Sequence, residues 1–313
     1  MGKGWVGVTY LANLAICFIM NVNIMLSNLK PHLWEMVADS VRFVAGALEA
    51  CGAEVKIGTS QLDPDALNLF FDRFYVEPNF PTQMKMGGVK YGLICTEVIA
   101  SDGTWNFGAE GNDPATFAAF ELAAKNAEFV WCLLEESVEA CRSINPNTAY
   151  LPFGYLKSME TLKCRTEAEK DIDLLMCGFP SNRRQKIVTE LSEAGHEVYY
   201  PAMPVPTYLR DSLMERSRVN LSLQKTEGHS IISVTRICHS VINRVPVLLE
   251  HSSSSNQYTE LCIMAGLGDV VPIAGKCLAQ DDLLELAEQN YQKLKTTLPM
   301  DEIMADVLEN TQK

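Results

Sequence analysis

The sequence predicts an α/β protein made of two Rossmann-like, doubly wound domains, each built on a parallel sheet, with a cleft between them. Two observations carry this prediction. Apolar, strand-like runs alternate with helical patterns along the 313 residues. In addition, the segment "LEACGAEVKI" in the first half is matched by "LSEAGHEVYY" in the second. Each half therefore opens with its own strand–helix–strand unit, which in a parallel sheet implies a right-handed crossover.

The first half begins with a buried strand in "ICFIMNVNIML", because strands covered on both faces read as continuous apolar runs. A helix over residues 35–51 follows and ends before Gly52, the expected residue just past a helix terminus. The remaining expected elements are a strand at 53–58, a strand at 91–99, a helix at 113–127 with Asp113 as a possible N-cap, a strand at 128–134, a helix at 138–144 and a strand at 148–155.

The second half follows the same logic after a polar, charged stretch between Tyr155 and Glu169. This stretch sets the domains at 1–155 and 156–313, the second with the C-terminal helices. The expected elements are strands at 171–178, 196–200, 219–223, 245–250 and 269–273, helices at 183–194 and 207–217, a helix from Ser230, and a tail rich in helix formers from residue 279.

Composition narrows the class of protein. The net charge of -13 argues against nucleic-acid binding, because nonspecific affinity comes from cations that neutralise phosphates. The ten cysteines show no C-x-x-C and no zinc-type spacing, which favours free thiols in a reducing cytoplasm and no metal site. Residues 5–26 carry no charge and are long enough to span a bilayer, but Asn13, Asn21 and Asn23 favour a folded soluble segment over membrane association.

Two strand-to-helix turns are candidate sites, because ligands of open parallel sheets bind beyond the carboxyl ends of the strands. The first is "CGFPSNRRQK", where Ser181 or Asn182 can cap a helix whose free N–H groups face an anion. Arg183 and Arg184 add positive charge there, although the alternative is that they are ordinary solvated residues of the first turn. Function is the favoured interpretation, since cations oppose the dipole at a helix N-terminus.

The second turn is "TEGHSIISVTRICHSVINRVPVLLE", residues 226–250, an apolar segment that nevertheless carries titratable groups. As a helix from Ser230 it places Ile231, Val234, Cys238 and Val241 on one stripe, with Ser233, Arg236 and His239 or Ser240 on another. Glu227 and His229 fall in the loop before it. The alternative is an ordinary solvent-exposed helix face, but four polar groups that converge on one turn favour a binding site.

These residues carry a resemblance. "DIDLLMCGFPSNRRQKIVTELSEAGHEVYY", "SRVNLSLQ" and "TRICHSVINRVPVLLE" resemble, in that order, the nucleotide-sugar-binding domain of GT-B glycosyltransferases, particularly CgeB-like and family-1 glycosyltransferase proteins. "WCLLEESVEACRSINPNTAYLPFGY" is similar to the end of their N-terminal domain. The resemblance covers roughly residues 90–275. It implies two domains with the nucleotide sugar on the second one, and no metal cofactor.

The sequence departs from the family at one pair of positions. Many retaining members carry two glutamates eight positions apart before the "P-V" strand, and the second holds the ribose. Ile231 and His239 occupy those positions here, whereas Arg236 matches the family arginine and Glu250 ends the strand. The missing pair implies that the nucleotide is held differently or that the activity is altered or lost.

The resemblance implies charge neutralisation of a diphosphate leaving group by arginine, lysine and helix N-termini. Arg183, Arg184, Lys225 and Arg236 are the candidates, and the expected donor site is completed by the following residues: Gly178, Ser181, Asn182, Glu227, His229, Ser230, His239 and Glu250. An inverting enzyme also needs a base from the first domain. Glu97 and Asp102 follow a strand and are the first candidates, with Glu135 and Glu136 as others; each alternatively is a surface carboxylate.

Two functions of different class follow. The first is a metal-independent glycosyltransferase that moves a sugar from a nucleoside-diphosphate sugar to an unidentified acceptor: a glycan, a protein or a small metabolite. The second is a non-catalytic, two-domain binding or interaction protein on a degenerated glycosyltransferase scaffold. A homodimer is compatible with both. A dehydrogenase is disfavoured, because no G-x-G-x-x-G follows either leading strand.

Overall fold

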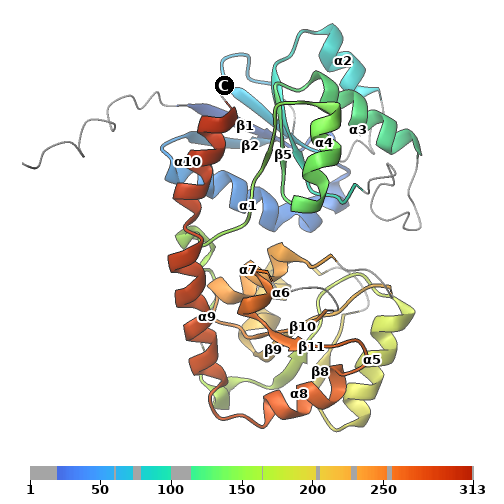
Figure 1. Ribbon diagram of the computed structural model, residues 1–313, viewed down its shortest axis with the longest axis vertical. Helices are drawn as coiled ribbons and strands as arrows, with labels where there is room; N and C mark the ends of the chain where they lie inside the picture. Colours follow the sequence, from blue (N-terminus) through green and yellow to red (C-terminus); the bar gives the residue numbers. More distant parts are fainter. Residues whose placement is uncertain are drawn as a thin grey trace, which may run out of the picture.

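The computed structural model describes residues 20–59, 61–72, 79–99, 114–163, 165–201, 205–226, 231–251 and 256–311. They form two α/β domains, one above the other in Figure 1. The first sheet has the order β2-β1-β3-β4-β5-β6 and the second β11-β10-β9-β7-β8, with every pairing parallel. The predicted pair of parallel α/β domains is confirmed.

In the first domain helices follow most of the strands, as in a doubly wound sheet, although β3 follows β2 directly. Its elements are β1 (Asn21–Met25), α1 (Trp34–Ala50), β2 (Glu54–Gly58), β3 (Leu67–Phe71), α2 (Phe80–Met86), β4 (Tyr91–Cys95), α3 (Pro114–Asn126), β5 (Phe129–Cys132), α4 (Val138–Ile144) and β6 (Thr148–Tyr150). Gly52, with φ at 88°, reverses the chain between α1 and β2, a conformation that favours glycine. β3 and α2 are absent from the sequence prediction.

The second domain repeats the alternation. Its elements are β7 (Ile172–Leu175), α5 (Asn182–Glu193), β8 (Val198–Tyr199), α6 (Thr207–Glu215), β9 (Ser217–Ser222), α7 (Val234–Ile242), β10 (Val247–Glu250), β11 (Ile263–Ala265), α8 (Val270–Leu278), α9 (Leu283–Thr297) and α10 (Met300–Thr311). The strand order changes direction between β7 and β9, as it does between β1 and β3 in the first sheet.

Two predicted elements differ from the structure. Residues 269–273 begin the helix α8 and are not a strand, because Asp269 precedes the helix and Pro272 lies in its first turn, where a missing N–H costs nothing. The edge strand is β11 instead. The helix expected from Ser230 begins at Val234, and Ser230 itself lies outside the described residues.

The last helix also departs from the expected domain division. α10 follows α9 out of the second domain and lies against the first one (Figure 1). Trp131 in β5 donates from its indole N–H to the Thr311 hydroxyl at 3.0 Å, and Asn147 donates to the Thr311 carbonyl at 3.3 Å. Residues 300–311 therefore complete the first domain, although they come last in the chain.

An apolar cluster continues from one domain into the other. It joins Val41 and Phe43 of α1 to Ile237 and Val241 of α7, and it includes Met304 of α10. α1 lies at the edge of the first domain that faces α6 and α7 (Figure 1). Within the described residues no helix is both long and apolar enough to cross a bilayer, and Trp5 to Ile19 lie outside those residues.

Candidate functional site

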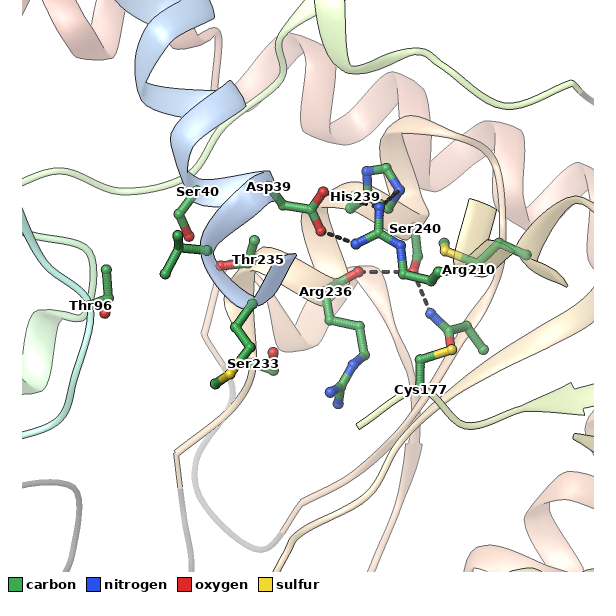
Figure 2. A pocket seen from close by; sticks show the side chains of 14 residues that line it. Asp39, Ser40, Thr96, Cys177, Arg210, Ser233, Thr235, Arg236, His239 and Ser240 are labelled. Carbon is green, nitrogen blue, oxygen red and sulfur yellow. Dashed lines mark hydrogen bonds and ion pairs between the residues drawn. The ribbon is translucent and has the colours of Figure 1, made fainter. Parts of the chain in front are cut away.

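A cavity of about 290 Å³ lies between the two domains, at the carboxyl ends of both sheets. One wall comes from the start of α1 and the turn after β4, and the other from β7, α6, β9 and α7 (Figure 2). Its lining residues are Met36, Val37, Asp39, Ser40, Thr96, Cys177, Arg210, Met214, Asn220, Ser233, Thr235, Arg236, His239 and Ser240.

The polar face of α7 supplies much of the second wall. Ser233, Arg236, His239 and Ser240 line the cavity, while Val234, Cys238 and Val241 are buried on the apolar side of the helix. This is the division that the 3.6-residue period of the sequence predicts. Ser240 is fixed in place, since it accepts a hydrogen bond from Asn220 at 2.8 Å and donates to the Arg236 carbonyl at 2.8 Å.

Arg236 faces the cavity, and none of the described residues pairs with its guanidinium. In the described part of the chain, no hydrogen bond or ion pair reaches its guanidinium, and none is drawn to it in Figure 2. Burial lowers the pKa of this guanidinium. A half-buried cation with no protein partner among the described residues is suited to an anionic ligand.

Gly178 allows two guanidiniums to approach the same point. A Cβ atom built on Gly178 would lie 3.0 Å from Nη2 of Arg236 and 3.2 Å from Nη1 of Arg184, tighter than ordinary contacts. Gly178 follows β7 and precedes α5, whose N-cap Ser181 accepts a hydrogen bond from the N–H of Arg184 at 3.2 Å. The N-cap expected from the sequence is thus present at the beginning of α5.

Arg183 and Arg184 have protein partners, in contrast to Arg236. Arg183 forms a two-pronged ion pair with Glu250, one arm at 2.6 Å, and donates to the Gln224 carbonyl at 3.2 Å. Arg184 donates to the carbonyls of Leu223, at 2.7 and 3.1 Å, and of Phe179, at 2.7 Å. Burial and the nearby Arg236 lower the pKa of Arg184 to about 10. These contacts tie the beginning of α5 to the ends of β9 and β10.

His239 lies in an ionic cluster that crosses the cleft. Its Nε2 lies 3.3 Å from Nη2 of Arg210 and 3.5 Å from a carboxylate oxygen of Asp211. Arg210 forms a two-pronged ion pair with Asp39 of α1, one arm at 3.0 Å (Figure 2). His239 is 3% exposed, and its Nδ1 is buried with no hydrogen-bond partner among the described residues.

The other predicted site residues divide into three groups. Glu97 is buried and outside the cavity lining: its backbone N–H donates to Asp72 at 3.0 Å, and its neighbour Thr96 reaches the cavity. Lys225 and Asn182 are exposed on the second domain. The predicted residues Asp102, Glu227, His229 and Ser230 lie outside the described residues.

Sequence reasoning missed the first-domain wall and Arg210. Asp39 and Ser40 lie in the helix that follows the first strand, so the rule about carboxyl ends of strands points to them, as it does to Thr96 after β4. The pairing of Asp39 with Arg210 has no sequence signal, because the two residues are 171 positions apart.

Two parallel α/β domains with a polar cavity between their switch points define the GT-B fold of glycosyltransferases, and this chain has that fold. The E. coli trehalose-6-phosphate protein bound with UDP-2-fluoro glucose is similar over 94% of this chain and 99% of its own, with a TM-score of 0.56 at 9% identity. An α,α-trehalose-phosphate synthase (UDP-forming) from Burkholderia vietnamiensis is similar over 91% of this chain and 87% of its own, with a TM-score of 0.51 at 10% identity.

A UDP-N-acetylglucosamine 2-epimerase from Listeria monocytogenes is also similar, over 92% of this chain and 95% of its own, with a TM-score of 0.52 at 11% identity. No protein-family model matches the chain, and neither does any curated protein sequence. At these identities the likeness establishes the fold, and the activity has to be argued from the site.

Proposed function

We propose that this protein is a glycosyltransferase that moves a sugar from a nucleoside-diphosphate sugar to an acceptor in the interdomain cavity, without a metal ion. The observation that carries the proposal is Arg236, a cation in the cavity wall without a partner among the described residues. A diphosphate supplies the missing negative charge. As the bond to the sugar breaks, charge grows on that diphosphate, and a fixed guanidinium stabilises the growing charge.

The surroundings of Arg236 support a diphosphate at this point. Gly178 leaves room for a ligand atom close to both Arg236 and Arg184, and the capped beginning of α5 follows directly. Arg183 and Glu250 hold this turn against β9 and β10, so their proposed role is to position the donor site. The solved E. coli relative bound with UDP-2-fluoro glucose has the same fold, which is consistent with a nucleotide-sugar donor.

The first-domain wall is the proposed acceptor side. Ser40, Thr96 and Asp39 offer hydroxyl and carboxylate groups across the cavity from Arg236 (Figure 2). Asp39 takes the place that Glu97 was expected to fill, because it lines the cavity and Glu97 does not. A carboxylate that accepts a proton from the acceptor hydroxyl would first have to leave Arg210, which a bound acceptor between the domains can bring about.

Isothermal titration with nucleoside diphosphates tests the donor site. Arg236→Ala should weaken binding of the preferred nucleotide about 10- to 100-fold, since a hydrogen bond to a charged group contributes about 1.5–3 kcal/mol. Arg216→Ala is the matched control: Arg216 pairs with Asp171 on the surface of the same domain and should leave the affinity unchanged. Absence of binding by the wild-type protein, or undiminished binding by Arg236→Ala, would refute the proposal.

The second candidate, a binding protein without transferase activity, is favoured by one observation. His239 stands where the resembled family has a ribose-binding carboxylate, and here it is buried against Arg210 and Asp211. Assays of donor hydrolysis and sugar transfer separate the two functions. Nucleotide binding that depends on Arg236, with neither hydrolysis nor transfer across a panel of acceptors, would establish the second candidate in place of the first.

A further inference from the structure

Three cysteine thiols meet in the core of the first domain, and none of them lines the cleft cavity. Cys95 and Cys132 end the neighbouring strands β4 and β5 and are register partners, so their side chains leave the same face of the sheet. Cys141 approaches from α4, which lies beside β5 in Figure 1. All three residues are 0% exposed, and their sulfur atoms lie within 4.8 Å of one another.

This spacing suits three sulfur ligands around one ion. A metal–sulfur bond of about 2.3 Å in a trigonal arrangement separates the sulfurs by about 4 Å. The three thiols need only small side-chain adjustments to reach that spacing. Their sequence separations, 37 and 9 positions, resemble no metal-binding motif, so the sequence predicted free thiols and no metal site. Only the folding of two strands and a helix onto one another brings the thiols together.

Charge decides which ion fits. Three thiolates around a monovalent or divalent cation keep a net negative charge, and burying an uncompensated charge is strongly unfavourable. The thiols lie in an apolar cluster with Phe70, Leu93 and Val130, and the carboxylate of Asp72 is among the causes that raise the pKa of Cys132, after its hydrogen bond with Cys141. Zinc, in addition, almost always takes four ligands. A trivalent thiophilic ion leaves no net charge.

We propose that Cys95, Cys132 and Cys141 form a binding site for trivalent arsenic, presented as arsenous acid. Each thiol replaces one hydroxide of arsenous acid: a sulfur–arsenic bond forms, an oxygen–arsenic bond breaks, and the thiol proton leaves with that hydroxide as water. Three exchanges give one neutral trithiolate and three waters. Arsenic stays trivalent throughout, so no oxidant or reductant is needed, and soft thiolate ligands suit such an ion.

The test uses the full chain, incubated with sodium arsenite under reducing conditions and then freed of excess reagent. Intact mass spectrometry should show one added arsenic atom and three lost protons. After denaturation without reductant, three of the ten thiols should fail to react with a thiol reagent. A second sample, refolded in the presence of arsenite, removes slow entry into the core as an explanation for a negative result.

Variants locate the site. Cys141→Ala and Cys132→Ala should each lose the three-thiol adduct, whereas Cys277→Ala, a buried cysteine in the second domain, should keep it. Each variant is first compared with wild type by circular dichroism. The proposal is overturned if neither wild-type sample holds arsenic, if Cys141→Ala keeps the adduct, or if zinc(II) or copper(I) is retained where arsenic is not.

Discussion

Three arginines surround the turn after β7, and the structure gives them different tasks. Arg183 is paired with Glu250, and Arg184 donates to backbone carbonyls, so both stabilise the turn. Arg236 comes from another helix and is the one that faces the cavity. At the residue scale, a sequence shows which cations lie near a turn. Only the structure shows which of them already pair with protein groups and which one can still bind a ligand.

The buried pair of Arg183 with Glu250 yields a stability prediction. Glu250→Ala leaves Arg183, whose side chain is 17% exposed, without its carboxylate, and breaking a buried pair in this way costs about 3–5 kcal/mol. Urea unfolding followed by circular dichroism measures the loss. Glu288→Ala, which removes the half-exposed partner of Arg244, should cost about 0–1 kcal/mol. Equal midpoints for the two variants would contradict the structural role given to Glu250.

At the scale of elements, the sequence predicts those whose pattern is local. β1, α1, β7 and α5 follow from apolar periodicity and from the glycines that end the two helices, Gly52 and Gly195, both with positive φ. β3 was missed because Asn68 interrupts its apolar run; the strand tolerates it since Asn23 of β1 donates to the Asn68 side chain at 3.0 Å. That hydrogen bond is a contact between distant segments, which no local pattern contains.

The candidate site likewise has parts that the local sequence predicts and parts that it does not. The polar face of α7 and the N-cap of α5 follow from helix periodicity and capping chemistry within a few residues. The wall contributed by α1 and the attachment of α10 depend on packing between segments far apart in the chain. For α10, the apolar positions Met300, Met304 and Val307 predict a helix with one buried face, but they do not say which domain buries it.

α10 should stabilise the first domain although it ends the chain. Met304→Ala removes a side chain that is 0% exposed in the cluster shared with α1, and a core Met→Ala change costs about 2–5 kcal/mol. All four tryptophans, at positions 5, 34, 105 and 131, precede the second domain, so tryptophan fluorescence during urea unfolding reports on the first. Met86→Ala, at a residue 84% exposed, is the control and should leave the midpoint in place.

On the scale of the whole molecule, the polypeptide crosses between the two domains twice. The segment after β6 leads from the first domain into the second, and α9 with α10 leads back (Figure 1). Polar contacts between α6 and α1 also join the domains. Thr207 of α6 donates to Glu35 of α1 from its backbone N–H, at 3.0 Å, and from its hydroxyl, at 2.6 Å. The arrangement of the domains around the cavity therefore depends on groups that titrate.

Acid should loosen this contact. Hydrogen bonds from the Thr207 hydroxyl and backbone N–H lower the pKa of Glu35 below its ordinary 4.5. Because the pKa is lowered in the folded protein, the stabilising free energy of this contact is fully present above pH 4.5. It is lost as the pH falls through the lowered pKa. Asp211, in the cluster with Arg210 and His239, responds in the same direction: although burial opposes it, hydrogen bonds from His239 and Arg210 lower its pKa.

Small-angle X-ray scattering across this pH range measures the domain arrangement directly. The radius of gyration of the wild-type protein should rise as the pH falls below 4.5, while circular dichroism still shows folded domains. Glu35→Gln keeps an acceptor oxygen for Thr207 but cannot titrate, so its radius should depend less on pH. Glu49→Gln, an exposed residue on the same helix, should follow wild type. If Glu35→Gln instead reproduces the wild-type curve, the contact between α1 and α6 does not control how the cleft opens.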